Sequence, residues 1–465
     1  MEKIRILHTN DLHSHFENFP QIERYFAKAQ KDDSVDRVFT FDAGDFMDRS
    51  HPLSDATKGQ FNVTLMNRFH YDAITIGNNE GISNSHDTLE HLFDHARFPV
   101  ILGNLREENE TMPKWCVSHK FFSTSSGTRI AVLGLTAAYP MTYGPNHWHV
   151  KLISSVMPQL LEKIKGQYDL LIVLSHLGLT MDRWLARHYP QITLIVGGHS
   201  HTYLPNGEKV GQTWIAQTGK WGEHIGDIHL ELDDHHHLKH ATLKTVETAR
   251  LSVSPEDAAV VSHYHQKGQD LLNQGKVAFL PIRFANDKRA AIDISLDAMA
   301  DFAQTKLAIL NSGLFLSPFG HGIVTKYDLQ KALPHPMHVV RTKLNGSDLW
   351  RLIMEMEKNR HYLEHFPLKG MSFRGKVFGQ IYYKGITVDP AHRLVYIDGQ
   401  EIDPQKRYEV AVLDHHVLVP FFPTLAIMGD NTFLFPKFLR EVVAAYLAKK
   451  YPLSQLKGKE LRDES

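Results

Sequence analysis

Short apolar runs alternate with longer amphipathic stretches over the first half of the chain. The apolar runs lie at residues 4–9, 38–44, 73–78, 99–104, 129–135, 170–176, 193–199 and 213–219, and each leads into a polar or glycine-rich loop. Such runs are typical of buried strands, whereas segments between them, such as 154–169, carry the periodicity of helices. We therefore predict an α/β fold with a largely parallel sheet, in which ligands gather beyond the carboxyl ends of the strands.

The pattern changes after residue 250. Residues 254–275 read as a capped, largely polar helix suited to joining two domains. From residue 277 onward helical and strand-like segments mix without strict alternation, and a closing helix is expected at 438–451. We expect a first domain at 1–250, a linker helix at 251–276 and a smaller α+β domain at 277–465.

Composition narrows the classes of partner and compartment. The 465 residues exceed the size at which one hydrophobic core usually keeps growing, which agrees with two domains. Lysine plus arginine (51) nearly equals aspartate plus glutamate (52), so no global charge attracts nucleic acid or an anionic membrane. The apolar runs are too short to span a bilayer, and the chain starts without the zones of a secretory signal. Because the single cysteine, Cys116, fits a reducing compartment, we expect a cytoplasmic protein without a membrane anchor.

Side chains with the chemistry of metal ligands follow five of the predicted strands. They are Asp11, His13, Asp45, Asn78, His176, His199 and His201. Because the carboxyl ends of parallel strands meet at one edge of a sheet, we expect these side chains to converge. Oxygen and imidazole ligands in this proportion suit Zn²⁺, Mn²⁺ or Fe²⁺, and the set exceeds what one ion takes. Two ions that share Asp45 as a bridge are the simplest solution.

The order of these segments resembles that of the calcineurin-like metallophosphoesterases. The motifs are ILHTNDLHSHF, DAGDFMD, TIGNNE, LSHLG and GGHSHT. The chain is most similar to the two-domain 5′-nucleotidase family, which also includes UDP-sugar hydrolases, and the C-terminal half shares this resemblance more thinly. The resemblance implies a four-layer α/β/β/α metallophosphoesterase domain followed by a smaller α+β domain of the 5′-nucleotidase type.

The resemblance also implies a ligand set and a reaction. One ion is expected on Asp11, His13, Asp45 and His201, and the other on Asp45, Asn78, His176 and His199. Two ions roughly 3.5 to 4 Å apart polarise a phosphoryl oxygen and lower the pKa of a bridging water, so that hydroxide attacks in line. We therefore expect a metal-dependent hydrolase of nucleotide-type phosphate esters or anhydrides, active in nucleotide catabolism.

One position departs from the family pattern. Where relatives carry a histidine paired with an aspartate three residues later, this chain has Asn79 and Ile82. An amide donates a hydrogen bond but supplies no proton, and losing a proton donor commonly costs about 10²- to 10⁴-fold in rate. Asn79 remains a catalytic candidate, and anhydrides or activated esters such as nucleotide sugars are expected to suffer less than simple monophosphates. His51 and Arg49 are candidates for a substitute acid; the alternative is that both lie on a mobile surface loop.

The substrate pocket expected in the second domain departs as well. Asn311 keeps the start of an Asn-Gly-Gly segment, but Leu316 replaces its arginine, and His335 stands where a stacking phenylalanine is expected. Phe433 lies one residue out of register with a second stacking aromatic. We predict Asn311, His335, Phe373 and Phe433 as substrate contacts, against the alternative that the two phenylalanines belong to the core.

Two other functions stay open at this point. The chain can be a metal-retaining nucleotide-binding or sensor protein whose catalysis has decayed. It can also hydrolyse a non-nucleotide ester, since the family it resembles includes an enzyme that cleaves a thiosulfate ester. The leading expectation is a nucleotide-like small-molecule substrate, and the sequence determines neither the metal nor the oligomeric state.

Overall fold

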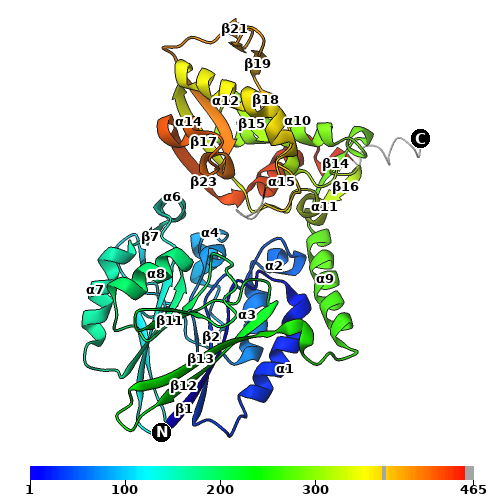
Figure 1. The fold of residues 1–465 in the computed structure, drawn as a ribbon. Coiled ribbons are helices and arrows are strands. Elements are labelled where there is room, and N and C mark those ends of the chain that lie inside the picture. Colours follow the sequence, from blue (N-terminus) through cyan, green and yellow to red (C-terminus); the bar gives the residue numbers. More distant parts are fainter. Residues whose placement is uncertain (369–372, 456–465) are drawn as a thin grey trace. The chain divides into compact units, whose positions relative to one another are not determined.

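The structure is a computed structural model that describes residues 1–368 and 373–455. The chain separates into two compact units, Met1–Gly268 and Gln269–Ser465 (Figure 1). Helix α9 (Asp257–Gln274) crosses this boundary and lies within the segment predicted as a linker helix. Each unit has its own buried hydrophobic clusters, as expected for a chain of this length.

Within the described residues, the N-terminal unit contains two large mixed sheets. The first has the order β13-β12-β1-β2-β3, with β1 (Glu2–Thr9), β2 (Arg37–Asp42), β3 (Ala73–Ile74), β12 (His224–Leu232) and β13 (Leu238–Glu247). The second has the order β10-β11-β9-β8-β6-β5, with β5 (His119–Ser123), β6 (Arg129–Thr136), β8 (Leu170–His176), β9 (Leu194–Gly197), β10 (Glu208–Val210) and β11 (Thr213–Ala216). The strands β1, β2 and β3 are parallel, as are β6, β8, β9 and β11, and antiparallel strands border both groups.

Helices cover the outer faces of the two sheets. Ile6 and Phe41 of the first sheet share one buried cluster with Ile172 of the second, so the sheets face each other. Helices α1 (Phe19–Ala29) and α3 (Gln60–Phe69) join the cluster on the outer face of the first sheet. Helices α7 (Ile153–Ile164) and α8 (Leu179–His188) join the cluster on the outer face of the second (Figure 1). The predicted four-layer α/β/β/α arrangement is confirmed.

The remaining elements of this unit are short. They are α2 (Pro52–Ala56), α4 (Asn78–Ile82), α5 (His86–Glu90), α6 (Pro140–Tyr143), β4 (Leu105–Glu107) and β7 (Trp148–Val150). All of them lie in the connections between the strands and long helices, where chemistry-bearing residues of layered α/β folds usually sit.

The apolar run at 99–104 does not form the regular strand that its pattern predicts. The amide of Ile101 donates to the carbonyl of Ile74 at 2.8 Å, whereas the amide of Gly103 donates to the carbonyl of Gly134 at 2.7 Å. Ile74 ends a strand of the first sheet and Gly134 belongs to the second. The run therefore links the two sheets instead of extending one ladder.

The C-terminal unit is a mixed α+β domain. Its main sheet has the order β18-β15-β22-β17-β23, with β15 (Leu307–Asn311), β17 (His338–Asn345), β18 (Ile381–Lys384), β22 (Arg407–Leu413) and β23 (Asp430–Phe438). Smaller sheets pair β14 (Lys276–Leu280) with β16 (Gly322–Thr325), and order β19 (Ile386–Asp389), β20 (Leu394–Ile397) and β21 (Gln400–Glu401). The helices are α10 (Lys288–Ala303), α11 (Lys326–Ala332), α12 (Gly346–His365), α13 (Asp414–Leu418), α14 (Pro423–Met428) and α15 (Leu439–Lys450). Across both units, none of the described helices has the length and apolarity needed to cross a membrane.

The only cysteine, Cys116, lies inside the N-terminal unit. Its side chain is 7% exposed and belongs to the cluster on the outer face of the first sheet. Burial raises the pKa of the Cys116 thiol to about 12. The thiol is thus neutral and shielded under ordinary conditions.

Candidate metal centre

All seven predicted ligands lie at or just beyond the carboxyl ends of parallel strands. Asp11 and His13 follow β1, Asp45 follows β2, Asn78 opens α4 after β3, His176 ends β8, and His199 and His201 follow β9. β3 is only two residues long because the chain turns at Gly77 into α4, and this turn carries Asn78 into the site. The structure therefore brings residues from five separate segments of the N-terminal unit to one edge of its sheets.

Most of these residues have an unusual backbone. Asp11, His13, Asp45, His199 and His201 all have φ between 48° and 72°. This left-handed region is sparsely populated by residues other than glycine, and each such residue costs on the order of 1 to 3 kcal/mol unless its surroundings support it. Such conformations cluster at functional sites because they aim side chains where regular strands and helices cannot.

One group of potential ligand atoms consists of Asp11, His13 and His201. The Nε2 atoms of the two histidines lie 2.9 Å apart. Oδ1 of Asp11 lies 3.6 Å from Nε2 of His13 and 3.3 Å from Nε2 of His201. All three donor atoms can therefore face one ion.

The second group consists of Asp11, Asp45 and His176. Nε2 of His176 lies 3.3 Å from Oδ2 of Asp45 and 3.9 Å from Oδ1 of Asp11. Oδ2 of Asp45 also lies 3.7 Å from Nε2 of His13. Asp11 belongs to both groups, and Asp45 lies close to one histidine of each group, His13 and His176. The bridging role of Asp45 stays a prediction.

Two buried atoms of the centre are suited to binding an electron-pair acceptor. Oδ1 of Asn78 and Nε2 of His176 are both buried without a hydrogen-bond partner. Buried polar atoms are normally satisfied, since leaving one unpaired costs about 1 to 3 kcal/mol. An amide oxygen and an imidazole nitrogen are both ordinary ligands of divalent transition metals, so these atoms fit a metal site.

The charges of the centre also favour cations. Burial alone opposes ionisation of Asp11, but the neighbouring imidazoles of His13, His201 and His176 hold its pKa well below the usual value. Burial favours neutral His176, but Asp45 and Asp11 outweigh it and raise the pKa of that imidazole to about 10. Two buried carboxylates thus draw positive charge toward themselves, and bound metal ions supply such charge.

Neighbouring groups orient the ligands. Nδ1 of His176 donates to the carbonyl of Ala43 at 2.7 Å, which directs its Nε2 toward the centre. The phenol oxygen of Tyr139 lies 2.7 Å from Nε2 of His199, which leaves Nδ1 of that ring available. Ligating histidines usually have their second nitrogen held in this way.

Asn79 contacts ligands with both its side chain and its backbone. Its Nδ2 lies 2.7 Å from Nδ1 of His13 and donates to the carbonyl of Met47 at 3.1 Å. Its backbone amide donates to Oδ1 of Asp45 at 2.8 Å. These contacts give Asn79 the position of a residue that orients His13 and Asp45; its predicted catalytic role stays a prediction.

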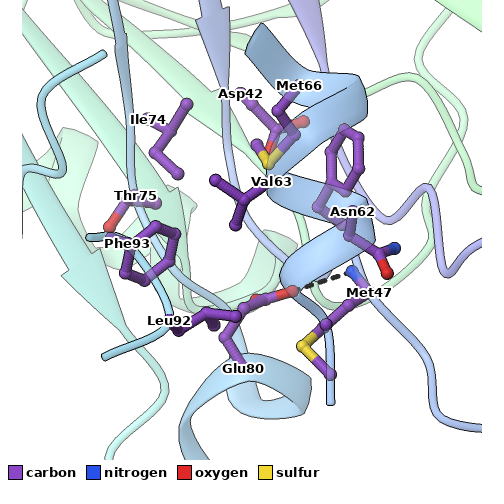
Figure 2. Close-up of a pocket in the computed structure, with 12 residues that line it drawn as sticks. Asp42, Met47, Asn62, Val63, Met66, Ile74, Thr75, Glu80, Leu92 and Phe93 are labelled. Atoms are coloured by element: carbon purple, nitrogen blue, oxygen red, sulfur yellow. Dashed lines mark hydrogen bonds between the residues drawn. The ribbon is translucent and has the colours of Figure 1, made fainter. Parts of the chain in front are cut away.

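Glu80 ties together the loops that carry Asp45 and Asn78. Its carboxylate accepts hydrogen bonds from the backbone amides of Asp45, Met47 and Gly77 at 2.8 to 3.0 Å. Burial and the charge of Asp45 raise the pKa of Glu80 to about 7. Figure 2 shows Glu80 bonded to Met47 beside a small cavity, whose volume of about 10 Å³ is far below the roughly 300 to 1,000 Å³ of small-molecule sites. This cavity is thus too small for a substrate.

The loops at Asp45 and Asn78 approach closely because both contain glycine. Gly44 has φ of 92°, and a Cβ there would lie 2.4 Å from the amide nitrogen of Gly77. A Cβ on Gly77 would lie 2.0 Å from Oδ1 of Asp45. Gly77 therefore leaves the space that the Asp45 carboxylate occupies.

We expect Gly77→Ala to displace the Asp45 carboxylate and to destabilise the protein by about 1 to 3 kcal/mol, the usual cost of overpacking. The measurement is the free energy of unfolding in urea, together with the number of Mn²⁺ ions bound per chain. Gly144→Ala is the matched control, because a Cβ on Gly144 meets open space within 4 Å. Equal metal content in Gly77→Ala and wild type would contradict the expectation.

Arg49 and His51 lie close to the centre in sequence but have protein partners. Arg49 is buried, and its guanidinium donates to Asp55 at 2.8 Å and to the carbonyl of Ser83 at 3.1 Å. The alternative of a mobile surface loop is therefore wrong for Arg49. His51 caps α2 and its ring centroid lies 4.5 Å from that of Phe16. Burial lowers the pKa of His51 to about 4, so its imidazole is neutral at neutral pH. A neutral imidazole is a poor proton donor. The catalytic roles of Arg49 and His51 stay predictions.

The predicted substrate contacts of the C-terminal unit are buried. Oδ1 of Asn311 accepts hydrogen bonds from Nε2 of His415 and Nε2 of His416, at 2.9 and 3.0 Å. The rings of His335 and Phe373 stack with centroids 4.9 Å apart. Like these, Phe433 is buried in the core of this unit. The structure thus places all four side chains inside the unit, and their role as substrate contacts stays a prediction.

Tyr139 is the neighbour of the centre that sequence reasoning missed. It lies in the connection between β6 and α6, and its side chain is 41% exposed although its phenol touches His199. The segment AAYP belongs to no motif that signals chemistry. Its position at the carboxyl end of a parallel strand is the one signal that points to it.

Comparison with known proteins places this geometry in context. The family model described as calcineurin-like phosphoesterase matches residues 4–203, and the one described as 5′-nucleotidase, C-terminal domain, matches residues 277–418. The chain is 33% identical to the uncharacterized metallophosphoesterase YunD of Bacillus subtilis, over 96% of this chain and 100% of that protein. It is 24% identical to protein UshA of Yersinia enterocolitica, over 97% and 92% of the two chains.

Solved structures share the fold at low sequence identity. The 5′-nucleotidase precursor of Thermus thermophilus aligns with a TM-score of 0.60 and 20% identity, over 97% of both chains. The NAD nucleotidase of Haemophilus influenzae aligns with a TM-score of 0.63 and 17% identity, over 97% of this chain and 96% of that one.

Proposed function

The chain belongs to the calcineurin-like metallophosphoesterases that carry a C-terminal 5′-nucleotidase domain, and on this basis we propose that it hydrolyses nucleotide-type phosphate esters or anhydrides with two divalent ions. Membership of this family makes it a metal-dependent hydrolase of phosphate ester bonds. The proposal adds the number of ions, the ligand set and the class of substrate. A nucleotide-like small molecule in the cytoplasm is the expected substrate.

The observation that carries the proposal is the pair of overlapping ligand groups, Asp11–His13–His201 and Asp11–Asp45–His176. The unpartnered Oδ1 of Asn78 and the nearby ring of His199 extend the second group, because the His199 and His176 ring centroids lie 5.2 Å apart. Two ions bound by these residues would polarise a phosphoryl oxygen and make a water more acidic. Mn²⁺, Zn²⁺ and Fe²⁺ all suit this donor set.

The remaining residues of the site position the ligands. Asn79 and Glu80 hold the Asp45 loop and His13, and Tyr139 holds His199. Asn79 offers only an amide, and its Nδ2 is directed to His13 and Met47. We infer that substrates whose leaving group departs without a proton, such as anhydrides and activated esters, are favoured over simple monophosphates.

A metal-supplemented activity screen tests the proposal. One preparation is assayed with Mn²⁺, Zn²⁺ or Fe²⁺ against an aryl phosphate, a nucleotide sugar, a dinucleoside polyphosphate, a nucleoside monophosphate and a cyclic nucleotide. Turnover of the nucleotide compounds supports the proposal. Turnover of the aryl phosphate alone favours a non-nucleotide ester as the substrate, and metal and nucleotide binding without turnover favours a binding or sensor protein.

Tyr139→Phe removes the hydroxyl that contacts Nε2 of His199 while keeping the ring. We expect the Mn²⁺ concentration for half-maximal activity to rise by about 10- to 100-fold, the usual effect of losing a partner of a ligating histidine. Activity at saturating Mn²⁺ is expected to change less, because the ligand itself remains.

The matched control for that variant is Tyr203→Phe. Tyr203 is exposed in the same unit, and its hydroxyl bonds Thr245. An unchanged Mn²⁺ requirement in Tyr139→Phe, or an equal rise in both variants, would show that Tyr139 does not position His199.

A further inference from the structure

A second group of potential metal ligands lies in the C-terminal unit, at the end of α12. This helix closes with the sequence HYLEH, which places His361, Glu364 and His365 at positions i, i+3 and i+4. Residues with this spacing lie on one face of a helix. One donor atom of each residue lies within 4.8 Å of the donor atoms of the other two. We propose that these three side chains bind one divalent transition-metal ion, of which Zn²⁺ is the best match.

Contacts within the helix turn the His365 ring toward such an ion. Nδ1 of His365 donates to the carbonyl of His361 at 3.1 Å. Nδ1 therefore carries the proton, and the lone pair of Nε2 is free to bind a metal. A backbone carbonyl that fixes the tautomer of a histidine is the arrangement common to metal-ligating imidazoles.

The carboxylate of Glu364 is held in a similar way. Oε1 of Glu364 accepts a hydrogen bond from Nε2 of Gln380 at 2.8 Å. This contact leaves the second carboxylate oxygen for coordination and limits the rotation of the side chain. Two of the three proposed ligands thus have an orienting partner before any metal arrives.

The separation of the donor atoms suits closure around an ion. In a tetrahedral site with metal–ligand bonds of about 2.1 Å, donor atoms lie about 3.4 Å apart. The donor atoms of the three residues lie within 4.8 Å of one another, and both histidines are exposed, which leaves their side chains free to rotate toward an ion. Two imidazoles and a carboxylate, with water in the fourth position, form a donor set typical of Zn²⁺.

The electrostatic setting favours a cation as well. The ligands lie in the last turn of a helix, where the unpaired carbonyls and the helix dipole attract positive charge. The nearby guanidinium of Arg360 is engaged by Glu357 and the carbonyl of Ile381. Lys358, one turn before His361 in α12, is a positive charge that would repel the ion, but it is exposed and its charge is screened by solvent.

The proposed ligands of this site are separate from those of the phosphoesterase centre. All of its ligands belong to the C-terminal unit, whereas the two other groups belong to the N-terminal unit. An ion bound here would cross-link the last turn of α12 and reduce fraying of the helix end. The expected role is therefore local stabilisation of the C-terminal unit.

Counting bound Zn²⁺ tests the proposal. The full chain, its His361→Ala/His365→Ala variant and a control variant are dialysed to equilibrium against micromolar Zn²⁺, and the ions per chain are counted by mass spectrometry. The control is His235→Ala/His237→Ala, which removes two exposed histidines whose ring centroids lie 6.3 Å apart. We expect the first variant to bind one ion fewer than wild type and the control to bind as many as wild type.

Hydrogen exchange provides a second readout at the site itself. Zn²⁺ is expected to slow exchange of the backbone amides in the last turn of α12 in wild type and in the control, but not in the variant lacking His361 and His365. Equal zinc counts in wild type and in that variant would overturn the proposal, as would an equal loss in both variants. Circular dichroism of each protein verifies that the counts refer to folded chains.

Discussion

The Asp45→Asn variant is expected to lose metal-dependent hydrolysis of an aryl phosphate by about three orders of magnitude or more. Oδ2 of Asp45 lies 3.3 Å from Nε2 of His176 and 3.7 Å from Nε2 of His13, so it faces both proposed ion sites. Asparagine keeps the size of the side chain but removes its negative charge and presents an NH₂ group on one side. Each ion would lose a charged ligand at the same time.

An aryl phosphate is the right substrate for this test because its leaving group hardly needs a proton. The loss of activity then reports on the ions and not on a missing acid. The assay uses initial rates with saturating Mn²⁺, and metal content is measured on the same samples. Asp94→Asn makes the same chemical change at an exposed aspartate of the same unit, and we expect it to retain full activity. Wild-type activity in Asp45→Asn would remove Asp45 from the centre.

The second large effect is a difference between substrates. We expect kcat/KM for AMP to be about 10²- to 10⁴-fold below that for the best nucleotide anhydride, because a nucleoside alkoxide needs a proton that an amide at position 79 does not supply. The measurement compares initial rates for both substrates with one preparation and one metal. Equal rates for AMP and the anhydride would contradict the inferred preference.

Asn79→Ala separates two explanations of that preference. The amide of Asn79 contacts His13, so its loss is expected to weaken metal binding and to lower the rates of all substrates by a similar factor. The ratio between anhydride and AMP should therefore stay unchanged. A selective loss on AMP would instead show that Asn79 assists the leaving group directly. Asn67→Ala is a suitable control, because the side chain of Asn67 bonds the carbonyl of His95 and the amide of Arg97, neither of which belongs to a proposed ligand.

Sequence patterns predicted the alternating strands and helices of the N-terminal unit because strand and helix periodicity are local properties, whereas its four layers were expected from the family resemblance. The carboxyl ends of β1, β2, β8 and β9 follow from where apolar runs stop, and this placed the candidate ligands at one edge. The run at 99–104 has the same apolar pattern, yet its amides bond to segments of both sheets. Which partners an apolar run finds depends on tertiary context, which periodicity does not contain.

The direction of individual side chains was harder to predict. Left-handed backbone at Asp45 and at His199 aims these residues, and short loops between strands carry no pattern that reports φ. The same limit explains why the orientation of Asn79 toward His13 and the contact of Tyr139 with His199 emerged only from the structure.

In the C-terminal unit, the sequence motifs did not reveal that the predicted substrate contacts are buried. His335 and Phe373 stack against each other inside the core, although His335 stands where the family pattern has a stacking phenylalanine and Phe373 was predicted as a substrate contact. Aromatic residues give the same sequence signal whether they fill a core or line a pocket. Their neighbours decide between the two, and those neighbours come from distant parts of the chain.

The buried thiol of Cys116 has a practical consequence for all the metal experiments above. Dithiothreitol and similar reagents, added routinely to protect cysteines, chelate zinc and manganese and distort both counting and rate measurements. This chain has one thiol, which is shielded from oxidants and cannot form a disulfide within the chain. Buffers free of thiol reductants are therefore suitable for the zinc and manganese experiments. A cysteine introduced at a chosen surface position would also be the one reactive handle for a fluorescent dye, without any need to mutate the native residue first.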